Sequence, residues 1–130
     1  MKPETRKFLD KAQSDLTDAK KIAAIDLANV AARSAYYAAF HAAEGFIFER
    51  AGKVAKTHSG VRSEFARLAK QSPQIDKAFA AFLSQAYIFK EISDYSVDQN
   101  QSVTIGEAVS AIANAERFVA AISALLEGQS

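Results

Sequence analysis

Arg33, Tyr37 and His41 are the first residues of this sequence whose types and spacing could do chemistry. Successive residues of an α-helix are rotated by ~100° about its axis, so residues four apart lie close together on its surface. These three residues can therefore share one face. A guanidinium, a phenol and an imidazole on one face could line a ligand-binding pocket. A packing role competes with this interpretation, because tyrosines also fill helical cores with their hydroxyl groups satisfied at the edge.

His41 and Glu44 form an H-x-x-E pair, one helical turn apart, that could supply two metal ligands. A metal site in a helical bundle needs further carboxylates and histidines from other helices. The chain has only two histidines, His41 and His58, so we expect no metal site. The sequence also lacks a nucleophile with a base at recognisable spacing, a phosphate-binding glycine loop and a Walker lysine. No cofactor is therefore predicted.

A second group surrounds His58, between Lys56 and Arg62 and beside an expected helix start. Helix-start amides and nearby cations attract anions, and histidine can act as an acid or a base near neutral pH. Residues 50–70 carry six basic side chains against Glu64 alone, a charge of +5, whereas the whole chain carries +1. Lys56, His58 and Arg62 are therefore candidate phosphate-binding residues. A solvated helix surface and a capping histidine would explain the same pattern.

Five segments of the sequence carry apolar residues at helical spacing, and these helices must position the groups above. No segment alternates apolar and polar residues as a β-strand would. The 27 alanines favour helix as well. The first helix should begin near Pro3 and end near Ile25. Asp26 should cap the second, which should run to about residue 50 or 51, where Gly52 can end it in the left-handed conformation.

The remaining three helices also have recognisable starts. Thr57 or Ser59 should cap the third, and Ser72 with Pro73 at the first helical position should open the fourth. A T-x-x-E capping box formed by residues 104 and 107 should start the fifth. The sequence thus predicts an all-α fold, an up-and-down bundle of about five helices, in a single domain over residues 1–130.

Composition narrows the class of protein further. There are no cysteines, which removes disulfides, thiolate catalysis and cysteine-based metal sites and favours a reducing cytoplasm. The charged first ten residues lack the apolar core of a signal peptide, and we expect no apolar run to approach the ~18 residues needed to span a bilayer. We expect a cytoplasmic protein without a membrane contact.

Three blocks carry a resemblance to a known family: Arg33-Ser-Ala-Tyr-Tyr-Ala-Ala-Phe-His41-Ala-Ala-Glu44, then Lys56-Thr-His58-Ser-Gly-Val61, then Asp94-Tyr95. In this order they resemble HEPN-domain proteins over nearly the whole chain, and more narrowly a small prokaryotic branch formerly catalogued as an uncharacterised protein family. The resemblance implies a helical bundle, commonly a homodimer, often encoded with a minimal nucleotidyltransferase in toxin-antitoxin pairs. Active members are metal-independent ribonucleases.

Active HEPN ribonucleases share an Arg-x(4-6)-His motif, and two protomers combine their copies into one cleft. Here Arg33 to His41 and Arg50 to His58 each enclose seven residues. Lys90 and Tyr95 have the right interval with different side chains, and neither is an effective general base at neutral pH. Lys90 and Asp94 also have the i,i+4 spacing of an ordinary surface pair.

The resemblance and the basic segment together give three hypotheses for function. The first is a dimer that binds RNA, a nucleotide or a cognate nucleotidyltransferase. The second is RNA cleavage at a rearranged site, in which His58 or His41 replaces the usual histidine and Arg33 or Arg62 stabilises the phosphorane. The third is a structural adaptor. The candidate ligand-binding residues are Arg33, Tyr37, His41, Lys56, His58, Arg62, Lys90 and Tyr95.

Overall fold

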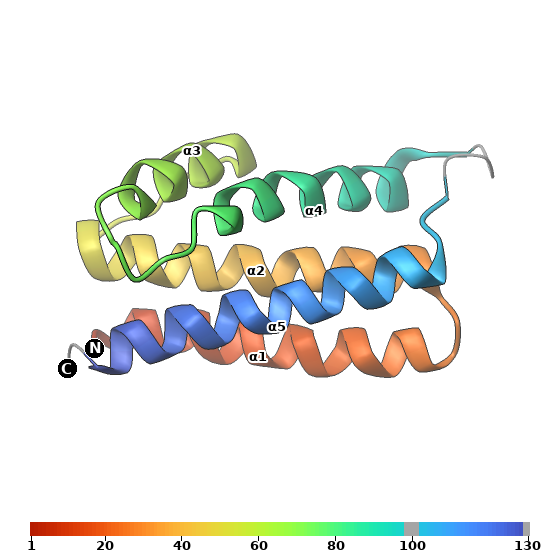
Figure 1. Cartoon of the computed structure of the whole chain (residues 1–130), viewed down its shortest axis with the longest axis horizontal. Helices are drawn as coiled ribbons and strands as arrows, with labels where there is room; N and C mark the ends of the chain where they lie inside the picture. The colour runs from red at the N-terminus through yellow and green to blue at the C-terminus, as the bar shows by residue number, and fades with distance from the viewer. Residues whose placement is uncertain (98–101, 129–130) are drawn as a thin grey trace.

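The computed structural model describes residues 1–97 and 102–128, which form five α-helices and, within these ranges, no strand. The helices are α1 (Pro3–Ala24), α2 (Ala28–Ala51), α3 (His58–Ala69), α4 (Ala78–Tyr95) and α5 (Ile105–Gly128). The three long helices α1, α2 and α5 run side by side, and α3 and α4 lie along α2 on the side away from α1 (Figure 1). The predicted all-α bundle is confirmed.

Helix α2 is the central element, because it contacts each of the other four helices. Its composition explains this position, since small side chains let neighbouring backbones approach closely. Seven of its alanines are buried: Ala31, Ala32, Ala35, Ala38, Ala39, Ala42 and Ala43. Near its end, a Cβ atom built on Gly45 would lie 3.2 Å from Phe8 Cβ of α1. The central helix is thus packed on several faces, as expected for a helix without a clear polar side.

Three of the predicted helix ends are confirmed. Gly52 has a φ of 75° and ends α2, with its N–H bonded to the Phe48 carbonyl at 2.8 Å. Thr57 caps α3, because its Oγ1 accepts the N–H of Gly60 at 2.9 Å.

The capping box at the start of α5 is the third. The Thr104 N–H donates to Glu107 Oε1 at 2.9 Å, and the Glu107 N–H donates to Thr104 Oγ1 at 3.0 Å. Both orphan donors at this helix start are therefore satisfied reciprocally.

The predicted cap at Asp26 is wrong. Asp26 instead adopts a left-handed conformation, with a φ of 62°, and its N–H bonds the Ala23 carbonyl. It therefore closes α1 rather than opening α2. Leu27 takes the capping position of α2 and makes no side-chain hydrogen bond there.

The predicted start of the fourth helix at Ser72 and Pro73 is also wrong. Both residues lie in the turn between α3 and α4, and α4 begins only at Ala78. The side chain of Asp76 accepts the Ala78 N–H at 2.8 Å, so an aspartate two residues before the helix supports its first turn. Burial of Ile75 anchors the turn to the core, which explains why an apolar residue outside the helix fitted the helical pattern.

The buried faces follow apolar helical spacing in α5 but not fully in α4. In α5 the buried residues include Ala108, Ile112, Ala115, Val119, Ile122 and Leu126, which recur at steps of three and four, whereas Ile105 at the start of the helix is exposed. In α4 the buried residues are Leu83, Ala86 and Lys90, and the phenylalanines at positions 79, 82 and 89 are only half-buried. A lysine therefore occupies a core position of α4.

The prediction that no segment is long and apolar enough to span a membrane is wrong for α5. By length and composition alone, α5 is long and apolar enough to cross a membrane. Its mean hydropathy is 1.4 over an 18-residue window, and 39% of that window is buried. A core helix of a bundle passes the same test, and α5 packs its apolar face against α2 and α1. The indication of a membrane span is accordingly weak.

Candidate functional site

Arg33, Tyr37 and His41 share one face of α2, as their spacing predicted, and all three line a groove between α1 and α2. The groove has a volume of about 640 Å³, within the usual range of small-molecule sites. Lys11 and Lys21 of α1 line the opposite wall together with the acidic Asp15 and Asp18, so the groove combines cations from both helices with two carboxylates, one aromatic ring and one imidazole.

Asp15 of α1 also lines this groove and was missed by the sequence interpretation. It is 6% exposed, and its Oδ1 accepts a hydrogen bond from Lys11 Nζ at 2.6 Å. His41 lies beside it, with Nδ1 2.7 Å from Glu44 Oε1 and Nε2 3.7 Å from Asp15 Oδ2. A signal was available, because Asp15 interrupts the otherwise apolar face that Ala12 and Leu16 form.

Arg33 links α2 to α4. Its Nε donates to Asp94 Oδ1 at 2.7 Å, and Lys90 Nζ lies 2.9 Å from Asp94 Oδ2. The hydrogen bond to Asp94 raises the pKa of Lys90 against the opposing effect of burial. Burial alone would raise the pKa of Asp94, but the bonds from Lys90 and Arg33 hold it below its usual value.

Lys90 and Asp94 are therefore not the ordinary surface pair that their spacing indicated. The Lys90 side chain is only 9% exposed, and its Nζ lies 5.7 Å from the Tyr87 ring centroid and 5.6 Å from that of Tyr95. Tyr95 itself is 73% exposed at the end of α4. The structure thus brings Lys90 and Tyr95 together, with the lysine held inside the bundle and the tyrosine at its surface.

His58, the first residue of α3, lies inside a cluster of aromatic rings. The Tyr36 hydroxyl is 2.6 Å from His58 Nδ1, and the Phe40 and Tyr87 ring centroids are 4.6 Å and 5.7 Å from that of His58. Burial, followed by the charges of Lys90 and Arg62, lowers the pKa of His58. The imidazole is therefore held in its neutral form near pH 7.

Tyr36 is fully buried in α2, and burial raises its pKa above the usual tyrosine range despite the nearby Arg62 guanidinium. A phenol that keeps its proton can donate to His58 Nδ1. The neutral ring then carries its own hydrogen on Nε2. Sequence interpretation missed Tyr36, although it stands in the same block as Tyr37, because nothing local places it opposite His58.

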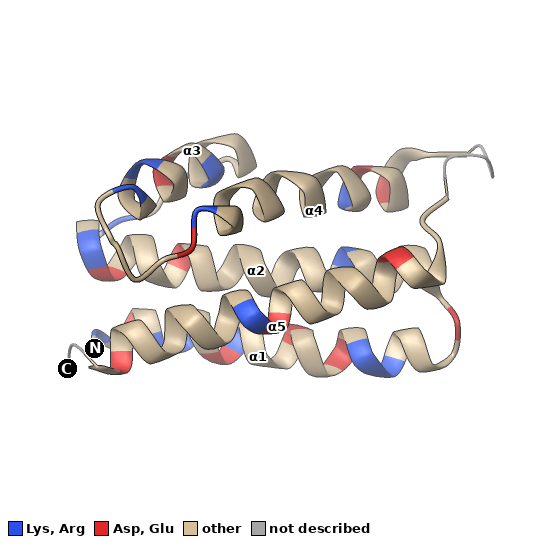
Figure 2. Cartoon of the chain, in the orientation of Figure 1, with Lys and Arg blue, Asp and Glu red and all other residues tan. Residues whose placement is uncertain are grey.

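Arg62 and Lys56 lie in different surroundings. Arg62 stacks on α4, with Cζ 3.9 Å from the Tyr87 ring centroid, and its Nη1 is buried without a hydrogen-bond partner among the described residues. Lys56 is exposed in the segment before α3. The basic residues of segment 50–70 are spread over the end of α2, the connection that follows it, and α3 with its C-terminal end (Figure 2). The structure does not gather Lys56, His58 and Arg62 into one exposed site.

Tyr37 joins the two groups of candidates. The Arg33 Cζ atom lies 4.9 Å from its ring centroid, and the ring centroids of His41 and His58 are each 5.9 Å away. The groove residues and the His58 cluster are thus in contact through one half-buried tyrosine. Within residues 1–97 and 102–128, no three His, Asp or Glu side chains come together as metal ligands.

Comparison with known proteins places the chain in a family. The sequence matches the HEPN domain over residues 5–125. The fold is similar to the crystal structure of TT1696 from Thermus thermophilus, with a TM-score of 0.71 at 22% identity, covering 94% of this chain and 98% of that one. No curated protein matches the sequence. Because the HEPN match spans almost all of the five-helix bundle, this chain belongs to the HEPN domain family.

Proposed function

We propose that the protein binds RNA or a nucleotide in the groove between α1 and α2. Membership of the HEPN family points to an RNA-related or nucleotide-binding function. The observation that carries the proposal is that Arg33, Tyr37 and His41 line one groove of about 640 Å³ together with two lysines of α1. Cations can hold phosphate, and an aromatic ring can stack on a base.

Exposed basic side chains at the end of α2, in the connection to α3 and on α3 support the same proposal. They lie outside the groove and could follow the phosphate backbone of a longer RNA. Lys56 is the candidate of this kind. Arg62 is committed to the Tyr87 ring, so we assign it to the folded cluster rather than to RNA contacts.

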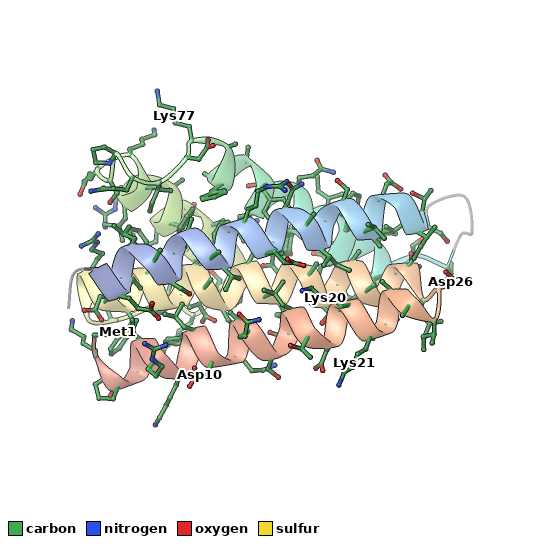
Figure 3. All side chains as sticks on the ribbon, turned by 60° about the horizontal axis from the view of Figure 1, so that its bottom comes forward. Met1, Asp10, Lys20, Lys21, Asp26 and Lys77 are labelled. Carbon is green, nitrogen blue, oxygen red and sulfur yellow. The ribbon has the colours of Figure 1, made fainter. Side chains whose placement is uncertain are left out.

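Two neighbouring lysines of α1 offer a matched test. Lys21 lines the groove, whereas Lys20 Nζ lies 2.9 Å from Glu116 Oε1 of α5. The two side chains leave α1 in different directions (Figure 3). Fluorescence anisotropy with a labelled single-stranded RNA, at increasing salt, should show affinity that falls steeply with salt and falls further in Lys21→Gln. Lys20→Gln should bind like the wild type. Salt-insensitive binding, or equal loss in both variants, would contradict the proposal.

A second candidate function, metal-independent RNA cleavage, is favoured by the His58 cluster alone. The Tyr36 hydroxyl at Nδ1 leaves the ring hydrogen on Nε2, so neutral His58 would donate a hydrogen bond to a phosphate or leaving oxygen, and would transfer a proton as a general acid only from its protonated form. In this alternative, unlike the first, Arg62 would have to leave the Tyr87 ring and turn toward the RNA to stabilise a phosphorane. His41, hydrogen-bonded to Glu44, is the alternative histidine.

Cleavage can be scored on the same RNA with EDTA present. Products that persist in EDTA and disappear in His58→Ala would establish a ribonuclease. Intact RNA in the wild type would leave a non-catalytic binding protein, and full cleavage in both His58→Ala and His41→Ala would exclude these two assignments.

We also propose that the protein forms a homodimer and can pair with a minimal nucleotidyltransferase, as in a toxin-antitoxin complex. Among the described residues the exposed large hydrophobic side chains are Ile25, Leu27, Val30, Ile88, Tyr95, Val97, Ile105 and Val109. They come from the α1–α2 connection and the first turn of α2, from the second half of α4 and the residues just after it, and from the first half of α5, toward the end of the bundle opposite both termini (Figure 1). A cysteine-free chain favours the cytoplasm as the site of such a complex.

Light scattering after size exclusion tests the dimer. The wild type should elute with twice the chain mass, and Leu27→Glu combined with Ile105→Glu should elute as a monomer, because charge at an apolar contact disfavours association. Co-expression with a nucleotidyltransferase encoded beside the gene tests the second partner. A wild type that stays monomeric at high concentration would count against the dimer.

A further inference from the structure

A buried carboxylate oxygen in the α1–α2 groove lacks a donor. Asp15 is 6% exposed, and its Oδ1 accepts from Lys11 Nζ at 2.6 Å. Its Oδ2 is buried and has no hydrogen-bond partner among residues 1–97 and 102–128. Leaving a buried acceptor unpaired is unfavourable, and such groups are rare in folded proteins. Because Asp15 lines the groove, a ligand there can supply the missing donor.

His41 places a second acceptor beside the first. Its Nδ1 is 2.7 Å from Glu44 Oε1, and a carboxylate only accepts hydrogen bonds, so the neutral ring carries its hydrogen on Nδ1. Its Nε2 is then an acceptor. This Nε2 lies 3.7 Å from Asp15 Oδ2, which is too far for a direct hydrogen bond. With His41 neutral, Nε2 and the buried Asp15 Oδ2 are thus two neighbouring acceptors at the groove, and the other polar atom of each side chain is already bound.

The backbone and side chain of Asp15 are held in place. Ser34 Oγ of α2 donates to the Asp15 carbonyl oxygen at 3.0 Å, which ties the two helices together at this point. Lys11 engages Oδ1, so Oδ2 is the carboxylate oxygen that remains without a donor. The acceptor pair is therefore preorganised rather than assembled by the ligand.

An amino group with two hydrogens matches this pair. A nitrogen can lie about 2.9 Å from each of two acceptors 3.7 Å apart and donate one hydrogen to each. Cytosine, adenine and guanine carry such an exocyclic amino group, whereas uracil has a keto oxygen in the place of the cytosine amine. A keto oxygen there would face two acceptors and be repelled. Arg33 and Lys21, which line the same groove, can hold the phosphate of the same nucleotide.

We propose that Asp15 and His41 read the exocyclic amino group of a nucleobase bound in the α1–α2 groove, so that the protein prefers cytosine to uracil. The inference rests on the proposed nucleotide-binding function and adds base selectivity to it. It also predicts what Asp15→Asn does. Lys11 would keep the amide oxygen on its own side, and the amide NH₂ would face the groove as a donor. The variant should then accept a keto oxygen and reject an amino group.

Isothermal titration of the full chain with CMP and UMP tests the inference directly. The wild type should bind CMP about tenfold more tightly than UMP or better, the size expected for one well-formed amino contact. Asp15→Asn should lose or reverse this preference. Asp10→Asn is the matched control, because Asp10 lies on the same helix (Figure 3), is exposed and is not among the residues that line the groove. It should keep the wild-type ratio.

The wild-type comparison stands even if Asp15→Asn fails to fold. Equal affinity for CMP and UMP would overturn base reading while leaving nucleotide binding intact. If CMP and UMP bind equally but dCMP does not bind, the acceptor pair would instead contact the ribose hydroxyls. Tighter binding of putrescine than of CMP would assign it to a free amine. No binding of any nucleotide or RNA would overturn the proposed function and the inference together.

Discussion

The Tyr36 hydroxyl of α2 donates to Nδ1 of His58, the first residue of α3, across 2.6 Å. The bond joins the fully buried face of the central helix to the start of a short helix, whose buried residues are Val61 and Phe65. It also fixes which imidazole nitrogen carries the hydrogen, and so determines what His58 can do chemically.

Removing this hydroxyl should destabilise the fold. Tyr36→Phe leaves the ring in place but deprives His58 Nδ1 of its donor, which should lower the free energy of unfolding by about 1–2 kcal/mol. Urea unfolding followed by circular dichroism measures the change. Tyr95→Phe is the control, because Tyr95 is exposed and its loss should change stability little. Equal effects in the two variants would mean that the Tyr36 hydroxyl contributes nothing.

Stability should fall in acid because of His58. Its folded pKa lies below the ordinary 6.5, so between these two values the unfolded chain binds more protons than the folded chain. The free energy of unfolding should therefore rise with pH through this window and decline as pH falls below about 6.5. Urea midpoints at about pH 5 and about pH 7.5 test the sign. His58→Phe should show a smaller difference between the two; an unchanged difference would assign the effect to other groups.

Because Lys90 is buried, removing Asp94 and removing Lys90 should have different effects on stability. Asp94→Ala removes the close partner of a lysine whose side chain is 9% exposed and leaves it Glu91 Oε2 at 3.9 Å, which should lower the free energy of unfolding by about 1–3 kcal/mol. Lys90→Met removes the buried charge and leaves Asp94 bonded to Arg33, so it should cost less. Chemical unfolding of both variants measures the difference. A larger loss for Lys90→Met would contradict this account.

Two glycines should respond to alanine with opposite signs. At Gly45 a Cβ would meet Phe8 Cβ at 3.2 Å and the Thr5 carbonyl oxygen at 3.5 Å, so Gly45→Ala pushes α1 from α2 and should cost about 1–3 kcal/mol. At Gly106 the nearest atom is 4.0 Å away, and Gly106→Ala should gain up to about 1 kcal/mol through helix propensity. Thermal melting compares the two. A stabilised Gly45→Ala would show that the helices have room to move apart.

Most of the fold could be predicted from the sequence, because its signals are local. The capping box at Thr104 and the left-handed Gly52 depend on neighbours within a few residues, and both are confirmed. The predicted start of α4 was wrong because burial of Ile75, a tertiary contact, mimicked one more helical position. Local patterns specify helix ends well where distant contacts do not act on them, and fail where a core contact overrides them.

For the candidate site, the sequence could predict which residues share a face of one helix, but not which residues meet across different helices. Periodicity placed Arg33 and Tyr37 on a common face, and the groove confirms that geometry. The bond from Arg33 to Asp94 joins residues 61 positions apart, and that between Tyr36 and His58 joins residues 22 apart. Both depend on how α3 and α4 dock on α2. No spacing rule in a single sequence carries that information, so the partners of each candidate emerged only with the fold.

The aromatic cluster also gives the molecule an optical signature of its own. The chain has no tryptophan and four tyrosines, so its ultraviolet fluorescence is tyrosine fluorescence alone. Three of the four stand in contact, with the Tyr36 ring centroid 5.2 Å from that of Tyr37 and 5.6 Å from that of Tyr87. Excitation absorbed by one ring passes readily among such neighbours. Three of the four fluorophores therefore lie where the groove and the His58 cluster meet, so a change in tyrosine emission reports on that region without any label being attached.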